Sequence, residues 1–330
     1  MLEGKRILII QTAFIGDVVL ATPLIENLYA TYPGARIDFL LRKGNENLLQ
    51  GHPKIANLLI WDKKKDKFKN LIKLIRKFRS EPYDLLINLQ RFGSTGLMTW
   101  LSGAKEKIGF SKNPFSFSYT RKVEHEIANG MHEVARNLKL IAHLVKNVAD
   151  KPKLYPPAEA IEKVKPYQQA RYIVLAPTSV WYTKQLPEEK WIEFLGALDF
   201  EGKIYLIGAP SDYEKCNRIL KESGKGENLC GRLSLIESVA LIKGAVMNYV
   251  NDSAPMHFAS SVDAPTCAIF CSTIPDFGFG PLATTSHVVE VAEKLACRPC
   301  GLHGKKECPE GHFDCGKLID TQQLIDCVKH

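Results

Sequence analysis

A single carboxylate stands where a strand-like segment gives way to a helix-like one. The segment Ile7–Ile10 is short, branched and apolar, as expected of a strand that is covered on both faces of a parallel sheet. Residues 11–16 predict a turn, and from Val18 onward the apolar residues recur at nearly a helical period. Asp17 therefore lies at or near a helix start, at the strand end where ligands bind in open α/β sheets. A helix N-cap is the alternative role for this aspartate.

A second polar cluster follows the strand-like segment Ala245–Val250. Asp252 and Ser253 come directly before Pro255, which predicts the first turn of another helix. Free N–H groups at such a helix start, with the helix dipole behind them, suit an anion such as a pyrophosphate. The same pattern also fits an ordinary N-cap, so both interpretations stay open.

Two more loops after strand-like segments carry polar side chains. The loop after Tyr172–Ala176 holds the hydroxyls of Thr178 and Ser179 and the cation of Lys184. A lysine in this place could bind a phosphate as a point charge, or it could be a solvated loop lysine. In the loop that begins at Gly208, Asp212 could accept hydrogen bonds from ribose hydroxyls or cap the next helix.

The elements that position these residues alternate between strand-like and helix-like patterns. This alternation predicts a doubly wound α/β architecture in two halves with a cleft between them. Prolines gather in residues 150–168 and predict the linker. We therefore expect a first domain over 1–155, a linker over 156–170, a second domain over 171–317 and a C-terminal helix over 318–330. The main strand-like segments are Ile7–Ile10, Ile37–Leu41, Ala56–Trp61, Tyr83–Leu89, Tyr172–Ala176, Lys203–Gly208, Ala245–Val250 and Thr266–Phe270, and helix-like ones include Met131–Leu144, Glu188–Leu198 and Leu233–Lys243.

Charge is shared unevenly along the 330 residues, whose formal net charge is +8. Residues 1–165 hold 28 Lys and Arg against 16 Asp and Glu, a net of +12, which leaves −4 for the rest. The excess peaks over Lys63–Lys69, which includes Lys64 and Lys65, and continues through Lys73, Arg76, Lys77 and Arg79. This stretch predicts an amphipathic basic helix. Such a helix suits an anionic acceptor or membrane surface, and a solvated helix face is the alternative. No nucleic-acid recognition motif accompanies it.

No apolar run approaches the roughly 20 residues that span a bilayer, and the first apolar run stops at Gln11, too soon for a signal-peptide core. We therefore expect a cytoplasmic protein. The basic stretch would suit peripheral association with an anionic membrane surface.

The chain resembles the heptosyltransferases of lipopolysaccharide core assembly, glycosyltransferase family 9. Each motif is weak alone, but together they follow the family's order over nearly the whole chain. The matching segments are Gly16–Pro23, Tyr83-Asp84 with Leu89-Gln90, Ile108–Phe110, Lys184–Trp191, Gly208–Pro210 and Asn251–His257.

The resemblance implies a GT-B fold, with an acceptor domain first and a nucleotide-sugar domain second, whose C-terminal helix packs back toward the first domain. It implies transfer of a heptose from an ADP-activated donor with inversion, and no required cofactor or catalytic metal. Asp17 matches the general base, and Lys184 with the amides after Asp252 would stabilise the departing diphosphate. The implied partners are the nucleotide-sugar donor, a lipid-linked anionic glycan acceptor and the cytoplasmic surface of the inner membrane. The implied donor-binding residues are Thr178, Ser179, Lys184, Asp212, Asp252, Ser253, Ala254, Met256 and His257.

Two positions depart from the family pattern. Ala254 stands where glycine is usual, and Ala would hinder a backbone of positive φ or a close phosphate approach. The loop that begins at Ala176 also lacks the common Pro-Gly-Ala. A different nucleotide-sugar donor or surface-glycan acceptor, and a nucleotide- or glycan-binding protein without catalysis, therefore stay open. A Rossmann dehydrogenase is disfavoured because no Gly-x-Gly-x-x-Gly follows a strand.

The chain has nine cysteines, and in a protein expected to be cytosolic they are not expected to form structural disulfides, because the cytosol is reducing. Four of them have a spacing whose first pair is typical of a zinc knuckle, and four thiolates would satisfy a tetrahedral structural zinc. Free thiols or a redox-dependent disulfide are the alternative. These four are Cys297, Cys300, Cys308 and Cys315.

Overall fold

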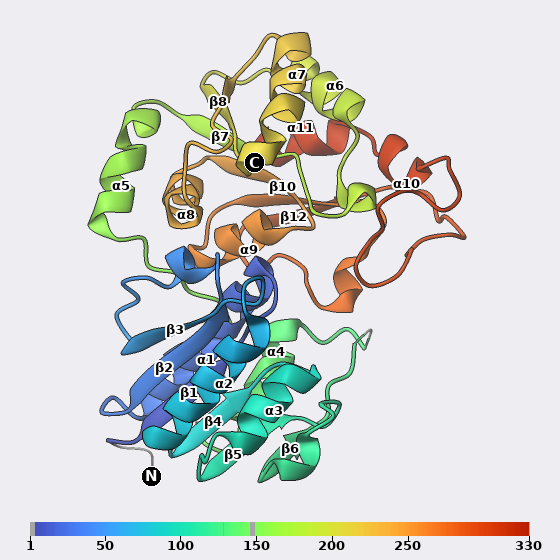
Figure 1. Cartoon of the computed structure of the whole chain (residues 1–330). Coiled ribbons are helices and arrows are strands. Elements are labelled where there is room, and N and C mark those ends of the chain that lie inside the picture. Colours follow the sequence, from blue (N-terminus) through green and yellow to red (C-terminus); the bar gives the residue numbers. More distant parts are fainter. Residues whose placement is uncertain (1–3, 128, 146–148, 330) are drawn as a thin grey trace. The chain divides into compact units, whose positions relative to one another are not determined.

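The computed structural model describes residues 4–127, 129–145 and 149–329, and the chain divides into two units, Met1–Tyr155 and Pro156–His330. Each unit contains a six-stranded parallel sheet with helices packed on it (Figure 1). All-parallel sheets need cover on both faces, which explains the uniformly apolar runs in their central strands. The expected α/β class with two doubly wound domains is confirmed.

In the first unit the strand order is β3-β2-β1-β4-β5-β6. Ile7 of the first strand pairs with Ile37 on one side and Leu85 on the other. Helices α1 and α4 pack together, as do α2 and α3. The elements are β1 (Arg6–Ile10), α1 (Ile15–Thr31), β2 (Arg36–Arg42), η1 (Glu46–Leu48), β3 (Asn57–Trp61), α2 (Lys67–Ser80), β4 (Leu85–Asn88), α3 (Gly93–Leu101), β5 (Glu106–Phe110), η2 (Ser116–Ser118), β6 (Arg121–Val123) and α4 (Glu133–Leu138), where η marks a 3-10 helix.

The second unit repeats this topology with the order β12-β11-β10-β7-β8-β9. The strand order of both sheets therefore reverses next to the unit's first strand, between β1 and β4 and between β7 and β10. Ligands bind at such switch points in open α/β sheets. The elements are α5 (Ala158–Val164), η3 (Lys165–Gln168), β7 (Tyr172–Ala176), η4 (Tyr182–Lys184), α6 (Glu188–Ala197), β8 (Lys203–Leu206), η5 (Pro210–Asp212), α7 (Tyr213–Ser223), β9 (Glu227–Asn228), α8 (Leu235–Lys243), β10 (Met247–Asn251), α9 (Ala254–Ser261), β11 (Thr266–Phe270), η6 (Pro275–Phe277), β12 (Ser286–Glu290), α10 (Asp314–Lys317) and α11 (Gln322–Lys329).

Two expected segments differ from the structure. The segment 156–170, expected to be a linker, forms α5 and η3 inside the second unit. The helix expected over Met131–Leu144 ends at Leu138, because the following amides bond three residues back in tight turns. Helix α11 places Leu324 in the apolar core of the second unit. Packing of this helix against the first domain stays a prediction, and its final residue, 330, lies outside the described residues.

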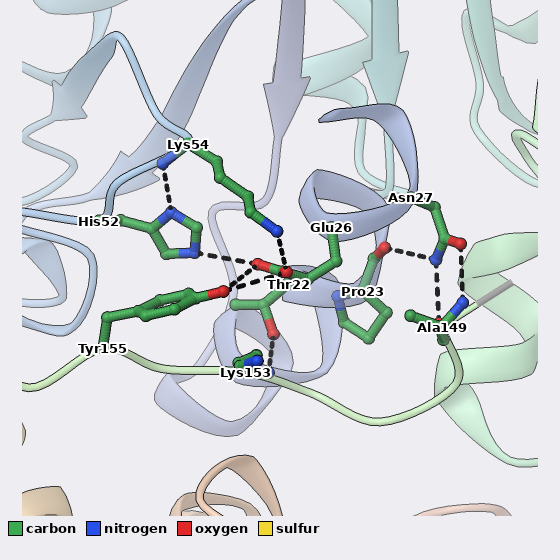
Figure 2. A network of polar contacts seen from close by, with 9 residues as sticks. All are labelled: Thr22, Pro23, Glu26, Asn27, His52, Lys54, Ala149, Lys153 and Tyr155. Carbon is green, nitrogen blue, oxygen red and sulfur yellow. Dashed lines mark hydrogen bonds and ion pairs between the residues drawn. The ribbon is translucent and has the colours of Figure 1, made fainter. Parts of the chain in front are cut away.

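The end of the first unit is fastened to helix α1 by a polar network (Figure 2). Glu26 is buried, and its carboxylate accepts from Lys54 Nζ at 2.5 Å and from the Tyr155 hydroxyl at 3.1 Å. One turn earlier, Thr22 Oγ1 accepts from the amide of Lys153 at 2.8 Å. The chain is thus held against α1 up to Tyr155, the last residue of the unit.

Over residues 4–127, 129–145 and 149–329, the structure contains no helix that is both long enough and apolar enough to cross a bilayer.

Candidate active site

Asp17 is the third residue of α1, and its carboxylate folds back on the turn before the helix. The backbone N–H of Phe14 donates to Asp17 Oδ2 at 3.1 Å. Burial, followed by the negative charge of Glu133, raises the pKa of Asp17 to about 6. The backbone hydrogen bonds to the carboxylate and the positive charge of Arg91 lower the pKa but do not offset this rise. A carboxylate with this pKa is ionised at neutral pH and still basic enough to accept a proton.

Two buried amides hold the loop between β1 and Asp17. Gln90 Nε2 donates to Gln11 Oε1, and the same oxygen accepts from the amide of Ala13 at 3.2 Å. The backbone N–H of Gln90 donates to Asn88 Oδ1 at 2.9 Å. The loop is therefore tied to the end of the neighbouring strand β4.

Three titratable residues of the same unit, Glu133, Arg136 and His125, are not predicted as site residues from the sequence. Glu133 accepts from Arg136 Nε at 2.7 Å and lies 3.2 Å from His125 Nε2. Burial alone would raise the pKa of Glu133, but these partners outweigh it and hold the pKa below its usual value. Glu133 thus stays ionised and contributes to the raised pKa of Asp17. Its only signal in the sequence is a Glu and an Arg three residues apart in a helix-like segment.

The lysines of the basic stretch do not lie on one helix, which corrects that expectation. Helix α2 begins only at Lys67, because Asp66 has a left-handed φ of 50° and Asp62 Oδ1 accepts from the amides of Lys64 and Lys65 at 3.0 Å each. Lys64 and Lys65 are exposed in this turn. Arg76 is exposed on α2 itself.

Lys63 points instead at the loop before Asp17. Its Nζ donates to the carbonyl of Thr12 at 2.7 Å and lies 4.8 Å from the ring centroid of Trp61. Partial burial, followed by the charges of Arg42 and Lys67, lowers the pKa of Lys63 to about 8. Lys63, Arg42 and Lys67, called the basic cluster below, therefore lie close together beside the loop that leads to the candidate base.

In the second unit, Lys184 and Asp252 form an ion pair. Lys184 Nζ lies 2.6 Å from Asp252 Oδ2, and the two side chains are 14% and 7% exposed. The Thr273 hydroxyl donates to the same carboxylate oxygen at 2.7 Å. Lys184 follows β7 and Asp252 follows β10, so the pair stands at the switch point of this sheet.

The loop between β7 and Lys184 is pinned to the strand beside it. Asn251 accepts from the amide of Leu186 at 2.9 Å and donates to the carbonyl of Ala176 at 3.3 Å. Thr178 and Ser179 are half-buried in this loop, and the carbonyl of Ser179 accepts from Gln185 at 2.7 Å.

Helix α9 begins at Ala254, two residues after Asp252, where a helix start is expected. Ser253 is its N-cap residue, but its hydroxyl donates to the carbonyl of Asn251 at 3.3 Å rather than capping the helix. Ala254 is the first helical residue and is absent from the positive-φ residues of the described chain, so alanine fits the backbone there. Met256 and His257, also predicted donor contacts, are buried in α9.

Asp212 closes a tight turn after β8. Its Oδ2 accepts from the amide of Ala209 at 2.7 Å. A Cβ on Gly208 would stand 2.9 Å from that oxygen, so the turn needs glycine at this position. The structure thus gives Asp212 a capping contact, and its contact with a ribose stays a prediction.

Residues 297–315, called the Cys-rich segment below, contain four thiols in one neighbourhood. Burial, and then the neighbouring thiols Cys300, Cys308 and Cys297, raise the pKa of Cys315 to about 12. Cys297 Sγ lies 3.9 Å from His312 Nε2. All nine cysteines are free, and the described residues include no group of three or more His, Cys, Asp or Glu side chains placed to hold a metal. The zinc site stays a prediction.

The predicted residues therefore fall into two groups, one in each unit. Asp17 and the basic cluster belong to the first unit, and Lys184, Asp252 and their neighbours belong to the second.

Comparison with known proteins identifies the family of the chain. The model of glycosyltransferase family 9 (heptosyltransferase) matches residues 71–312. Lipopolysaccharide heptosyltransferase 3 of Escherichia coli is 28% identical in an alignment of 277 positions that covers 79% of this chain and 82% of that protein.

Solved structures share the fold. A glycosyltransferase of family 9 from Veillonella parvula superposes with a TM-score of 0.86 at 21% identity, over 100% of this chain and 97% of that one. The E. coli heptosyltransferase WaaC with ADP-2-deoxy-2-fluoro heptose superposes with a TM-score of 0.74 at 19% identity, over 98% and 99% of the two chains. The fold is thus GT-B, and the protein belongs to glycosyltransferase family 9, the heptosyltransferase family.

Proposed function

We propose that the protein transfers a heptose from ADP-heptose, with inversion at the anomeric carbon, to an anionic acceptor of the lipopolysaccharide inner core. The observation that carries this proposal is Asp17, a carboxylate of raised pKa at the switch point of the first sheet. Family membership supports the reaction class. The names of the relatives, a lipopolysaccharide heptosyltransferase and WaaC with an ADP-heptose analogue, support the choice of donor and acceptor.

In the proposed reaction Asp17 is the general base. It takes the proton from the acceptor hydroxyl while that oxygen bonds to the anomeric carbon of the heptose. The bond between this carbon and the diphosphate oxygen breaks in the same displacement, and ADP leaves. The raised pKa makes Asp17 a stronger base than an exposed aspartate, yet leaves it ionised at neutral pH.

The second unit would bind the donor. Lys184 would place its positive charge at the diphosphate, where negative charge grows as the bond breaks, and the first amides of α9 would donate to the same oxygens. This stabilisation needs no metal ion. Thr178 and Ser179 would line the phosphate loop, and Asp212 would bind the ribose. Asp252 would orient the ammonium group that it holds at 2.6 Å.

The basic residues of the first unit would bind the acceptor. Lys63 is the best placed, because its side chain contacts the loop that leads to Asp17. Lys64, Lys65 and Arg76 are exposed and would attract the phosphates of a lipid-linked glycan at the cytoplasmic surface of the inner membrane. A different sugar donor or surface-glycan acceptor is the alternative within this enzyme class.

The donor assignment is tested by calorimetric titration of ADP, UDP, GDP and CDP at fixed salt. We expect ADP to bind tightest, and Lys184→Ala to weaken it by at least about tenfold, since a charged hydrogen bond is lost. Lys165→Ala, which removes an exposed lysine paired with Glu162, is the control and should leave binding unchanged. Preference for another nucleotide would change the donor sugar. Binding of none would favour a glycan-binding protein without catalysis.

The catalytic assignment is tested with Asp17→Asn, which keeps an oxygen for the Phe14 amide. Turnover of ADP-heptose should fall by at least about a hundredfold, while ADP binding is retained. Turnover close to that of the wild type would remove Asp17 from the role of base.

A further inference from the structure

The Cys-rich segment runs against the loop that carries Lys184. The Thr183 amide donates to the carbonyl of Lys305 at 3.1 Å, and the Lys305 amide donates to Thr183 Oγ1 at 2.8 Å. Ser272 Oγ donates to the same hydroxyl oxygen at 2.9 Å. Thr183 is 1% exposed, so water cannot reach the Lys305 and Ser272 donors if this hydroxyl is removed, and leaving them unpaired costs free energy. One buried hydroxyl therefore joins three segments directly beside Lys184.

Gly304 packs on the side chain of Lys184 itself. A Cβ at this position would stand 2.9 Å from Lys184 Cγ and 3.1 Å from Trp181 Cβ. Gly304 also has a φ of +72°, which favours glycine. The backbone of the Cys-rich segment thus lies directly on the aliphatic stem that carries the ammonium group.

Arg298 fixes the start of the segment to the end of β11. Its guanidinium donates to the carbonyls of Cys271 at 2.6 Å and Thr273 at 2.9 Å, and to Glu290 Oε2 at 2.6 Å. Thr273 is the residue whose hydroxyl donates to Asp252. The segment therefore reaches both partners of the ion pair, Lys184 from one side and Asp252 through Thr273.

We propose that the Cys-rich segment sets the position of the Lys184 ammonium group for the donor diphosphate, with Thr183 and Gly304 as its positioning residues. The proposal rests on the proposed donor role of Lys184. It gives the segment a function that needs neither a metal nor a disulfide. In an elongated, flexible side chain such as lysine, contacts along the stem decide where the charge is held.

The test compares Thr183→Val, Thr183→Ser and Thr266→Val by titration with ADP. Valine keeps the shape of threonine but leaves the Lys305 amide and the Ser272 hydroxyl without their acceptor, so the dissociation constant for ADP should rise about tenfold. Serine restores the acceptor and should restore binding. Thr266, the first residue of β11, is as fully buried as Thr183, and its hydroxyl donates to the nearby carbonyl of Ala264 at 2.8 Å, so its valine variant controls for stability loss alone. Equal ADP binding by Thr183→Val and the wild type would overturn the proposal.

Gly304→Ala provides an independent variant, should Thr183→Val fail to fold. The added methyl group meets Lys184 Cγ, so ADP binding should weaken while the thermal midpoint stays near that of Thr266→Val. Unchanged ADP binding by a folded Gly304→Ala would also overturn the proposal. Lys184→Ala distinguishes failure of the donor role from failure of the positioning role. If Lys184→Ala binds ADP as tightly as the wild type, the donor role of Lys184 is wrong. If Lys184→Ala binds ADP more weakly while Thr183→Val and Gly304→Ala bind it normally, only the positioning role is wrong.

Discussion

Asp17 combines two demands that oppose each other, since a helix start favours an ionised carboxylate and burial disfavours it. Burial has the larger effect, and the negative charge of Glu133 adds to it, so the pKa of Asp17 rises to about 6. The residue that is proposed to accept the proton is therefore held in an environment that makes its charged form costly.

The pH dependence of turnover should report this pKa. If Asp17 must be ionised to act as base, kcat/KM for ADP-heptose should rise with pH through a midpoint near 6 and level off above it. Glu133→Gln removes the negative charge, so the midpoint should move to lower pH. An acidic limb near 4 in the wild type, or a limb that Glu133→Gln leaves in place, would contradict this account.

Asp17 should also cost stability at neutral pH. The pKa of Asp17 is 3.8 in the unfolded chain and about 6 in the folded chain. Between these values the folded state keeps a proton that the unfolded state has lost, so the free energy of unfolding falls as pH rises from about 4 to 6. Above pH 6 the neutral Asp17→Asn should be more stable than the wild type by about 1–3 kcal/mol.

Urea unfolding at pH 4 and pH 7.5 measures this difference. The advantage of Asp17→Asn should be present at pH 7.5 and shrink at pH 4. A variant that is less stable than the wild type at pH 7.5 would mean that the carboxylate contributes net stabilising contacts.

Single residues could be predicted where chemistry and local sequence coincide. Asp17, Lys184 and Asp252 each follow a recognisable strand, and the parallel sheet of each unit then places its own residues at that sheet's switch point. Glu133 and Thr183 could not be found this way, because Glu133 acts on Asp17 through its charge in the folded unit and Thr183 contacts a segment distant in sequence. Thr183 and Lys305, for example, are 122 residues apart.

At the scale of elements, α1 serves two purposes on one helix. Its first turn carries Asp17, and two turns later Glu26 holds the end of the unit through Lys54 and Tyr155 (Figure 2). His52 completes this network, with Nδ1 accepting from the Lys54 amide and Nε2 standing 3.7 Å from Glu26. Burial outweighs the attraction of Glu26 and lowers the pKa of His52 to about 4.

This histidine should make the first unit sensitive to acid. The unfolded chain binds a proton at His52 near pH 6.5 and the folded one only near pH 4, so the free energy of unfolding falls as pH drops through this interval. The full effect is on the order of 3 kcal/mol. His52→Gln should flatten the dependence, measured as unfolding free energy at pH 6.5 and pH 4.5. An equal slope in both proteins would assign the acid sensitivity to other groups.

Elements were predictable where the apolar pattern was strong. The central strands β1, β7 and β11 agree closely with their apolar runs. The edge strands β6 (Arg121–Val123) and β9 (Glu227–Asn228) were not predicted, because they are short and polar and are defined by their pairing with a neighbour. The start of α2 was placed too early because the charge pattern does not reveal the left-handed Asp66.

For the whole molecule, the two units differ in charge. Met1–Tyr155 holds 26 Lys and Arg against 14 Asp and Glu, a net of +12, and the remaining residues have a net of −4. A positive unit attracts anionic partners over about a Debye length, which is roughly 8 Å at physiological salt. This difference in charge could be predicted from the sequence, whereas the exposure of apolar side chains among the basic residues could not.

Helix α2 places Phe68 and Ile72, which are 72% and 50% exposed, among its exposed lysines. Apolar side chains inserted at a lipid surface and basic ones above it bind anionic membranes together. The full chain should therefore co-sediment with vesicles of phosphatidylglycerol but not of phosphatidylcholine, and 0.5 M salt should weaken the binding. Replacing both side chains by serine should reduce binding, whereas Ile161→Ser, which removes a similarly exposed side chain from α5 of the negative unit, should not. Equal loss in both variants would contradict a role for Phe68 and Ile72 in membrane binding. Binding that does not depend on the charge of the lipid would contradict a role for the lysines. Either result would mean that α2 is a solvated helix.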